Sequence, residues 1–113
     1  MIQIHDISGF CPVQALGTVD GHPFYFRARG PLTIQVADYP NAEPSMVGIG
    51  ATGWKWDGTD DPEWIDRSGG TVVDGLPYFG WMDLVTAREC VEKVLTAYLA
   101  GPVDGKDGWT RYE

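Results

Sequence analysis

Three side chains at alternate positions of one stretch have the chemistry to bind an anion: Tyr25, Arg27 and Arg29. Alternate residues of a β-strand point to the same face, so an aromatic ring would lie beside two guanidinium groups. Guanidinium groups bind phosphates and carboxylates through paired hydrogen bonds, and an aromatic ring stacks on a nucleobase. The pattern predicts a site for a nucleotide or another small anion, within one chain or across a homodimer. The simpler alternative is a solvated strand face, where Tyr and Arg are common.

The segment from Trp54 to Asp66 is a second candidate, because it concentrates tryptophans and carboxylates. It holds three tryptophans and five acidic residues. Protein interfaces are commonly anchored by tryptophan inside a polar rim. The segment therefore predicts a contact loop for a partner with a basic surface. The proposed contact residues are Trp54, Trp56, Asp57, Asp60, Asp61, Glu63, Trp64 and Asp66. The alternative is that Trp54 and Trp56 cap the core while the acidic side chains stay in water.

Two further motifs fail on closer inspection. The glycine spacing from Gly48 to Gly53 matches that of a dinucleotide-binding turn. Such a turn must open a helix, and the residues from Trp54 to Gly58 cannot begin one. A calcium-binding loop that starts at Asp57 would need glycine at its sixth position and glutamate at its twelfth. Those positions hold Pro62 and Ser68, so no metal site is expected.

The nucleophilic and imidazole side chains form no recognisable catalytic set. The chain has two histidines, His5 and His22, and two cysteines, Cys11 and Cys90. None is spaced with a base, a nucleophile or a further ligand that would complete a site. We therefore expect a protein that is not an enzyme and that uses no cofactor, with an enzyme of unknown class as a minor alternative.

Charge and composition restrict the class of partner. The 113 residues carry a formal net charge of -8, with a pI of about 4.5 and a hydrophobic fraction of 43%. Such a chain folds as a globular domain but lacks the basic footprint that direct nucleic-acid binding needs. It suits a host protein or ribonucleoprotein with a basic surface. No run of residues is long and apolar enough to span a membrane, and no signal peptide is recognisable. A cytoplasmic protein with reduced cysteines and no membrane partner is therefore expected.

The central predicted element is a β-hairpin around Asp20-Gly21. Asp-Gly between apolar runs is the strongest short-range signal for a two-residue turn with positive φ. In the resulting register Val19 faces His22 and Val13 faces Ala28. One face then carries only small and apolar residues and is predicted to be core: Val13, Ala15, Gly17, Val19, Phe24, Phe26 and Ala28.

A further strand is predicted over Leu32 to Ala37. A two-residue turn at Gly30-Pro31 would point Leu32 away from the core, so a bulge or a longer loop is expected there. The composition next predicts a loop over Asp38 to Ser45 and a short strand over Met46 to Gly50.

A second hairpin is predicted around Asp74-Gly75, with arms over Thr71 to Asp74 and Leu76 to Met82. Pro77 restricts the second arm to a sheet edge or an irregular path.

One amphipathic helix is predicted near the end of the chain. It begins at Asp83 or Thr86, where Thr86 and Glu89 match a capping box, and it ends at Gly101. Glu89 and Lys93 are expected to pair on its wet side. Its apolar stripe recurs at steps of three and four residues. The stripe comprises Ala87, Cys90, Val91, Val94, Leu95, Tyr98 and Leu99.

These elements predict an α+β fold: a curved antiparallel sheet of about four to six strands with one C-terminal helix packed on a face. Residues 1–102 are expected to form a single domain, and residues 103–113 a polar C-terminal tail. The tail is either mobile or folded back through Trp109.

The hairpin from Gly17 to Gly30 and the segment from Gly80 to Met82 carry a family resemblance. The chain resembles small, mostly uncharacterised proteins predicted from bacteriophages and prophages. Those proteins share the pattern G-x-V-x-G-x-x-FYFRARG and a GWM segment before a C-terminal helix. The resemblance covers about a third of the chain and carries no assigned chemistry. It implies an origin in a mobile element, and small acidic phage proteins include anti-CRISPR and other anti-defence inhibitors.

Overall fold

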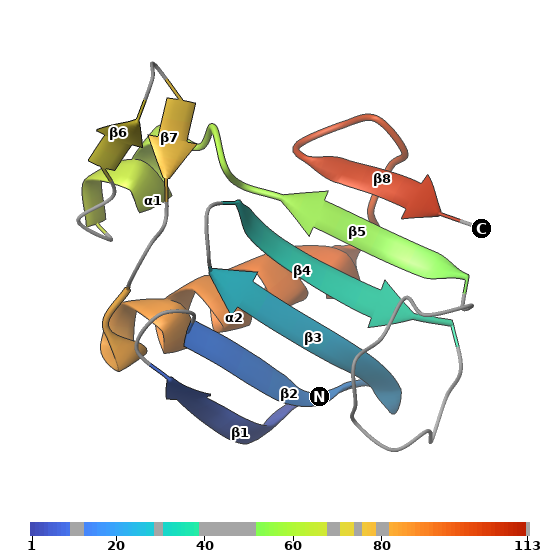
Figure 1. The fold of residues 1–113 in the computed structure, drawn as a ribbon. Coiled ribbons are helices and arrows are strands. Elements are labelled where there is room, and N and C mark those ends of the chain that lie inside the picture. The colour runs from blue at the N-terminus through green and yellow to red at the C-terminus, as the bar shows by residue number, and fades with distance from the viewer. Residues whose placement is uncertain are drawn as a thin grey trace.

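The computed structural model describes residues 1–9, 13–28, 31–38, 52–67, 71–73, 76–78 and 82–112. In this part of the chain a six-stranded antiparallel sheet combines with a long helix, so the predicted α+β class is confirmed (Figure 1). The predicted strand over Met46 to Gly50 lies outside the described residues, as do Cys11, Arg29 and all of the loop after Asp38.

The described elements are, in chain order, β1 (Ile2–Gly9), β2 (Val13–Val19), β3 (His22–Ala28), β4 (Leu32–Ala37), β5 (Gly53–Asp57), α1 (Pro62–Arg67), β6 (Thr71–Val73), β7 (Leu76–Tyr78), α2 (Leu84–Ala100) and β8 (Trp109–Tyr112). The large sheet has the order β1-β2-β3-β4-β5-β8, and β6 pairs with β7 in a separate sheet. The last strand of the chain therefore lies at one edge of the large sheet, beside β5.

The central hairpin has the predicted register. Val19 pairs with His22 and Val13 with Ala28. Asp20 and Gly21 have φ values of 50° and 80°, as a two-residue turn of this hand requires. Gly17 also has a steric role, because a Cβ atom there would lie 2.0 Å from the Gln3 carbonyl oxygen and 2.7 Å from the Phe24 ring.

The connection between β3 and β4 restores the core face, as expected. Ala28 pairs with Leu32, so three residues separate the two strands instead of two. Leu32, Ile34 and Val36 are accordingly buried. Thr33 lies opposite Arg27.

One face of the sheet and one side of α2 share a single hydrophobic core. In Figure 1 the helix lies behind the sheet. The hairpin contributes six side chains of its predicted core face, all with no exposed area: Val13, Ala15, Val19, Phe24, Phe26 and Ala28. From the helix, Ala87, Cys90, Val91 and Leu95 belong to the same cluster.

The start of α2 corrects part of the prediction. Asp83 is the N-cap, and its carboxylate accepts hydrogen bonds from the Thr86 backbone N–H at 2.8 Å and from the Thr86 hydroxyl at 2.9 Å. Thr86 therefore lies inside the first turn, and the predicted capping box with Glu89 is wrong. Gly101, with a φ of 103°, ends the helix as expected. Leu99 is 42% exposed and does not extend the apolar stripe.

The second predicted hairpin is present in the described residues as the strand pair β6 and β7. Val73 pairs with Leu76, and the described part of the second arm is β7, Leu76–Tyr78; Asp74 and Gly75 lie outside the described residues. Trp109 is 4% exposed and pairs with Trp56. Of the two alternatives for the tail, the chain therefore folds back through Trp109.

Among the described helices, none has the length and apolar character to cross a membrane.

Candidate functional site

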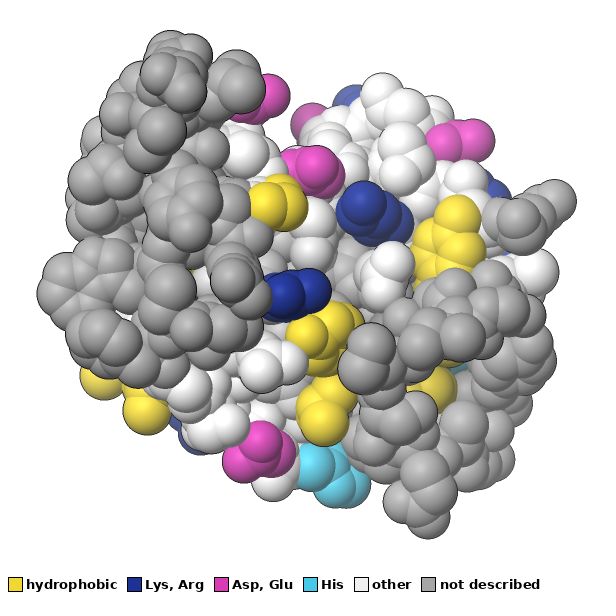
Figure 2. All heavy atoms as spheres, in the orientation of Figure 1, with side chains coloured by type: hydrophobic (Ala, Val, Ile, Leu, Met, Phe, Trp, Pro, Cys, Tyr) yellow, Lys and Arg dark blue, Asp and Glu magenta, His cyan; other side chains and the backbone are white. Residues whose placement is uncertain are grey.

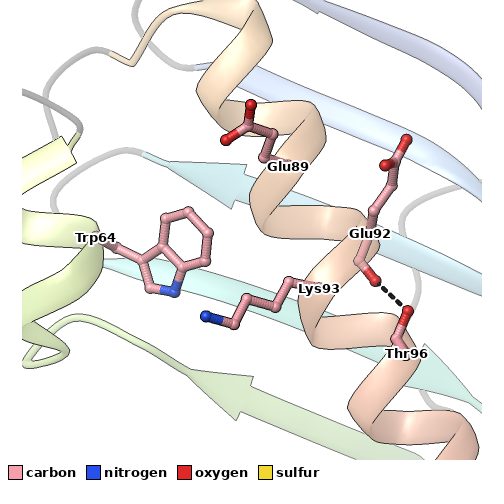
Figure 3. A pocket seen from close by; sticks show the side chains of 5 residues that line it. All are labelled: Trp64, Glu89, Glu92, Lys93 and Thr96. Carbon is pink, nitrogen blue, oxygen red and sulfur yellow. Dashed lines mark hydrogen bonds between the residues drawn. The ribbon is translucent and has the colours of Figure 1, made fainter.

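Two adjoining hollows lie on the side of the sheet that α2 covers. Their volumes are about 440 and 260 Å³, and both are lined by Trp64 of α1 and Lys93 of α2. Figure 3 shows these two side chains pointing toward each other across the space between the helices. We call the two hollows together the acidic groove, because the described residues that line them include five with carboxylates: Asp61, Glu63, Glu89, Glu92 and Asp107.

The ammonium group of Lys93 lies in the acidic groove and contacts both Glu63 and Trp64. The Lys93 ammonium donates hydrogen bonds to both carboxylate oxygens of Glu63, at 2.5 and 2.7 Å. The same nitrogen lies 5.8 Å from the centre of the Trp64 ring, within the range of a cation–π contact. The Lys93 side chain is nonetheless 64% exposed and that of Glu63 35% exposed. Ion pairs with this much exposure contribute only about 0.2–1 kcal/mol each.

Buried indoles form the floor of the acidic groove. Trp56, Trp64 and Trp109 are 5%, 2% and 4% exposed. Two glycines lie close against the Trp56 ring. A Cβ atom on Gly58 would lie 2.1 Å from the far edge of that ring, and one on Gly108 would lie 3.1 Å from its near edge. The floor is therefore closely packed and apolar, beneath a rim of carboxylates.

This arrangement suits the recognition of a positively charged side chain. Carboxylates attract an ammonium or guanidinium group, and an aromatic face adds a favourable contact with the same charge. Against five carboxylates, Lys93 is the single basic side chain among the described residues that line the acidic groove. Among the described residues that line it, none is histidine or cysteine.

The predicted contact segment folds differently from the loop that was expected. It forms strand β5, a turn and helix α1. The alternation of Trp54, Lys55 and Trp56 has the period of a strand. Asp61 then starts the helix, because its carboxylate accepts a hydrogen bond from the Glu63 backbone N–H at 3.0 Å and Pro62 occupies the first helical position.

The structure brings only part of that segment into the acidic groove. Trp56, Asp61, Glu63 and Trp64 line it. Since Trp56 and Trp64 are almost fully buried, they act as its floor and not as protruding anchors. For Trp56 the core alternative of the sequence analysis is the better description.

The remaining members of the segment lie elsewhere. Trp54 is half-buried beside Arg111, with the guanidinium carbon 5.5 Å from the centre of its ring. Asp57 is exposed and points to the opposite face of the sheet from Trp56, which precedes it in β5. Asp60 is exposed in the turn before α1. The side chain of Asp66 lies outside the described part of the chain.

Sequence reasoning missed the half of the acidic groove that α2 and the C-terminal residues supply. Glu89, Glu92, Lys93 and Thr96 follow steps of three and four residues, so they share one side of the helix. That spacing was visible in the sequence, but nothing there showed that α1 would face it. Trp109 reaches the floor only because β8 pairs with β5.

The predicted anion site lies on the other face of the sheet. In the register Tyr25 pairs with Gln35, which pairs with Lys55. Figure 2 shows Lys and Arg side chains near the middle of this face, next to hydrophobic ones. Arg27 is exposed, and neither it nor Lys55 has a carboxylate partner among the described residues. The Tyr25 hydroxyl donates a hydrogen bond to Gln14 at 2.6 Å. Arg29 lies outside the described residues.

A separate charged cluster joins β4 to β8. Arg111 donates two hydrogen bonds to the Asp38 carboxylate, one of them 2.8 Å long, and the Thr52 hydroxyl donates a third at 2.6 Å. The hydrogen bonds from Arg111 lower the pKa of Asp38 despite its partial burial, which acts in the opposite direction. Burial raises the pKa of the nearby Tyr98 hydroxyl. Because Asp38 and Trp54 already engage the guanidinium, this cluster is a structural clamp.

Comparison of the chain with family models, with curated proteins and with solved structures found no match. The function is therefore inferred from the chemistry of the described surfaces.

The histidines lie away from the acidic groove. His5 is exposed, and His22 is half-buried with its Nδ1 3.0 Å from the Ala37 carbonyl oxygen. Since a carbonyl oxygen only accepts, this nitrogen donates. In the described residues, no three or more His, Cys, Asp or Glu side chains are grouped so as to hold a metal ion.

Proposed function

We propose that this chain is a non-enzymatic interaction protein whose acidic groove binds a basic segment of a partner protein or ribonucleoprotein. The supporting observation is the contact of Lys93 with Glu63 and Trp64, in which a carboxylate and an indole already hold an ammonium group. A basic side chain of a partner would meet the same two groups, with further carboxylates around it. The net charge of -8 would also favour association with a basic surface.

The resemblance to small phage proteins supports a more specific role. On this proposal the protein acts in the cytoplasm of an infected host and inhibits a defence complex, as anti-CRISPR proteins do. An acidic groove would compete with nucleic acid for a basic surface on that complex, without binding nucleic acid itself.

The binding proposal is tested with a fluorescently labelled oligoarginine peptide and fluorescence anisotropy. Glu92→Lys reverses an exposed charge on the acidic groove, and Asp6→Lys makes the same change of net charge on the edge strand β1. We expect Glu92→Lys to weaken binding by about three- to tenfold and Asp6→Lys to leave it nearly unchanged. No binding by the wild-type protein, or equal effects of both substitutions, would overturn the proposal.

The open face of the sheet supports a second candidate function, the binding of a nucleotide or another small anion. The charged side chains of Arg27 and Lys55 lie on this face and have no carboxylate partner among the described residues. Tyr25 supplies an aromatic ring beside them. A nucleotide present at a hundred times its Kd would stabilise the fold by about 2.7 kcal/mol, which a thermal-shift assay detects. Arg27→Ala should abolish that shift, whereas Arg88→Ala on α2 should not.

A further inference from the structure

The ammonium group of Lys93 occupies the position that a ligand would be expected to take in the acidic groove. It donates to both oxygens of Glu63, at 2.5 and 2.7 Å, and lies 5.8 Å from the centre of the Trp64 ring. These are the contacts by which carboxylates and indoles recognise a basic side chain from another protein. The groove is therefore a cation site whose cation belongs to the same chain.

We propose that Lys93 is a tethered competitor, and that an arginine of the partner's basic segment displaces its ammonium from Glu63 and Trp64. This inference rests on the proposed function, because it assigns the type of side chain that the acidic groove binds and the residue that controls access to it.

The exposure of the contact makes displacement feasible. Lys93 is 64% exposed, so water already competes for its ammonium. The side chain reaches Trp64 from α2 through a flexible four-carbon stem (Figure 3). It can therefore rotate into solvent while the helix and its buried residues stay in place.

Arginine has two advantages over the lysine that it displaces. Its planar guanidinium makes two parallel hydrogen bonds with one carboxylate, and it stacks on an aromatic ring. It is also more weakly hydrated than an ammonium group, so it loses less on entering a site with an apolar floor. A segment rich in arginine should consequently bind better than one rich in lysine.

Two substitutions at Lys93 move the expected affinity in opposite directions. Lys93→Gln removes the tethered cation and should tighten binding of the labelled oligoarginine peptide by about three- to tenfold. Lys93→Arg supplies a stronger internal competitor and should weaken binding relative to the wild-type protein. Arg88→Gln makes the same change of net charge at an exposed position of α2 that does not line the acidic groove, and it should have little effect. An oligolysine peptide of equal length should bind more weakly than oligoarginine to all of these proteins.

The outcomes separate this inference from the proposed function. Tighter binding by Lys93→Gln together with weaker binding by Lys93→Arg supports the tethered competitor. If the wild-type protein binds the peptide but Lys93→Gln binds equally or less well, the competitor is refuted while the acidic groove remains a binding site. If the wild-type protein does not bind, both proposals fail. Should Lys93→Gln not fold, as judged by circular dichroism, the direction of the Lys93→Arg effect decides.

Discussion

The clamp between Asp38 and Arg111 should control how firmly the last strand is held. Arg111 lies in β8 and Asp38 follows β4, so their hydrogen bonds span the intervening strand β5. Asp38→Asn removes the negative charge of this pair with almost no change in the size of the side chain. The two side chains are 35% and 28% exposed, between a surface pair and a buried one. We therefore expect the free energy of unfolding to fall by about 1–2 kcal/mol.

The same substitution should make stability less dependent on pH in the acid range. The hydrogen bonds from Arg111 lower the pKa of Asp38 in the folded protein. In the unfolded chain the pKa of this carboxyl keeps its ordinary value of about 3.9. A carboxyl group with a lowered folded pKa contributes its stability above the unfolded value. That contribution is lost as pH falls through the folded pKa. The wild-type protein should thus exceed Asp38→Asn in stability at neutral pH, and the difference should shrink below about pH 4.

Urea denaturation of four proteins measures the effect: the wild type, Asp38→Asn, Arg111→Gln and the double variant. A coupling energy of about 1 kcal/mol between the two substitutions is expected at neutral pH and almost none in acid. Asp6→Asn removes an exposed carboxylate from β1 and serves as the control. Additive effects at neutral pH, or an undiminished difference in acid, would refute the reasoning.

Three other predictions concern the packing of the domain. Gly58→Ala should destabilise the fold by about 1–3 kcal/mol in urea denaturation, because the added methyl group would collide with the Trp56 ring. A wild-type midpoint for that variant would contradict the packing of the groove floor. Asp83→Ala should lower the melting temperature at neutral pH but not in acid, since hydrogen bonds from the first turn of α2 lower the pKa of this N-cap carboxyl. An equal effect at both pH values would argue against the cap. In a Cys11→Ser background, Cys90 should resist a thiol reagent until the protein unfolds, because its side chain has no exposed area. Rapid labelling of the folded protein would show that α2 opens readily.

The central hairpin was predictable because every determinant of it is local. Asp20-Gly21 selects the turn, the turn selects the register, and the alternation of small and aromatic residues selects the buried face. The buried stripe of α2 followed in the same way from its periodicity. The N-cap was harder to choose, since Asp83 and Thr86 both have the required chemistry and only their mutual hydrogen bonds decide.

The acidic groove could be predicted only in part, because it is assembled from distant segments. Local sequence indicated the tryptophans and carboxylates near α1. The burial of these tryptophans, however, depends on β5 lying inside the sheet with β8 beside it. The pairing of Trp56 with Trp109 joins residues far apart in the chain. The Glu63 and Lys93 contact likewise links α1 with α2. No periodicity or motif encodes such long-range pairs.

The two faces of the sheet lead to a test of independence between the proposed functions. The net charge of -8 predicts a basic partner, but it does not show that carboxylates gather around the acidic groove while Arg27 and Lys55 lie on the opposite face. Because the sheet separates these surfaces, substitutions on one should act independently of ligands on the other. Arg27→Ala should leave oligoarginine binding unchanged, and Glu92→Lys should leave any nucleotide-dependent thermal shift unchanged. Crossed effects of similar size would mean that both ligands respond to net charge alone, and neither face would then be a specific site.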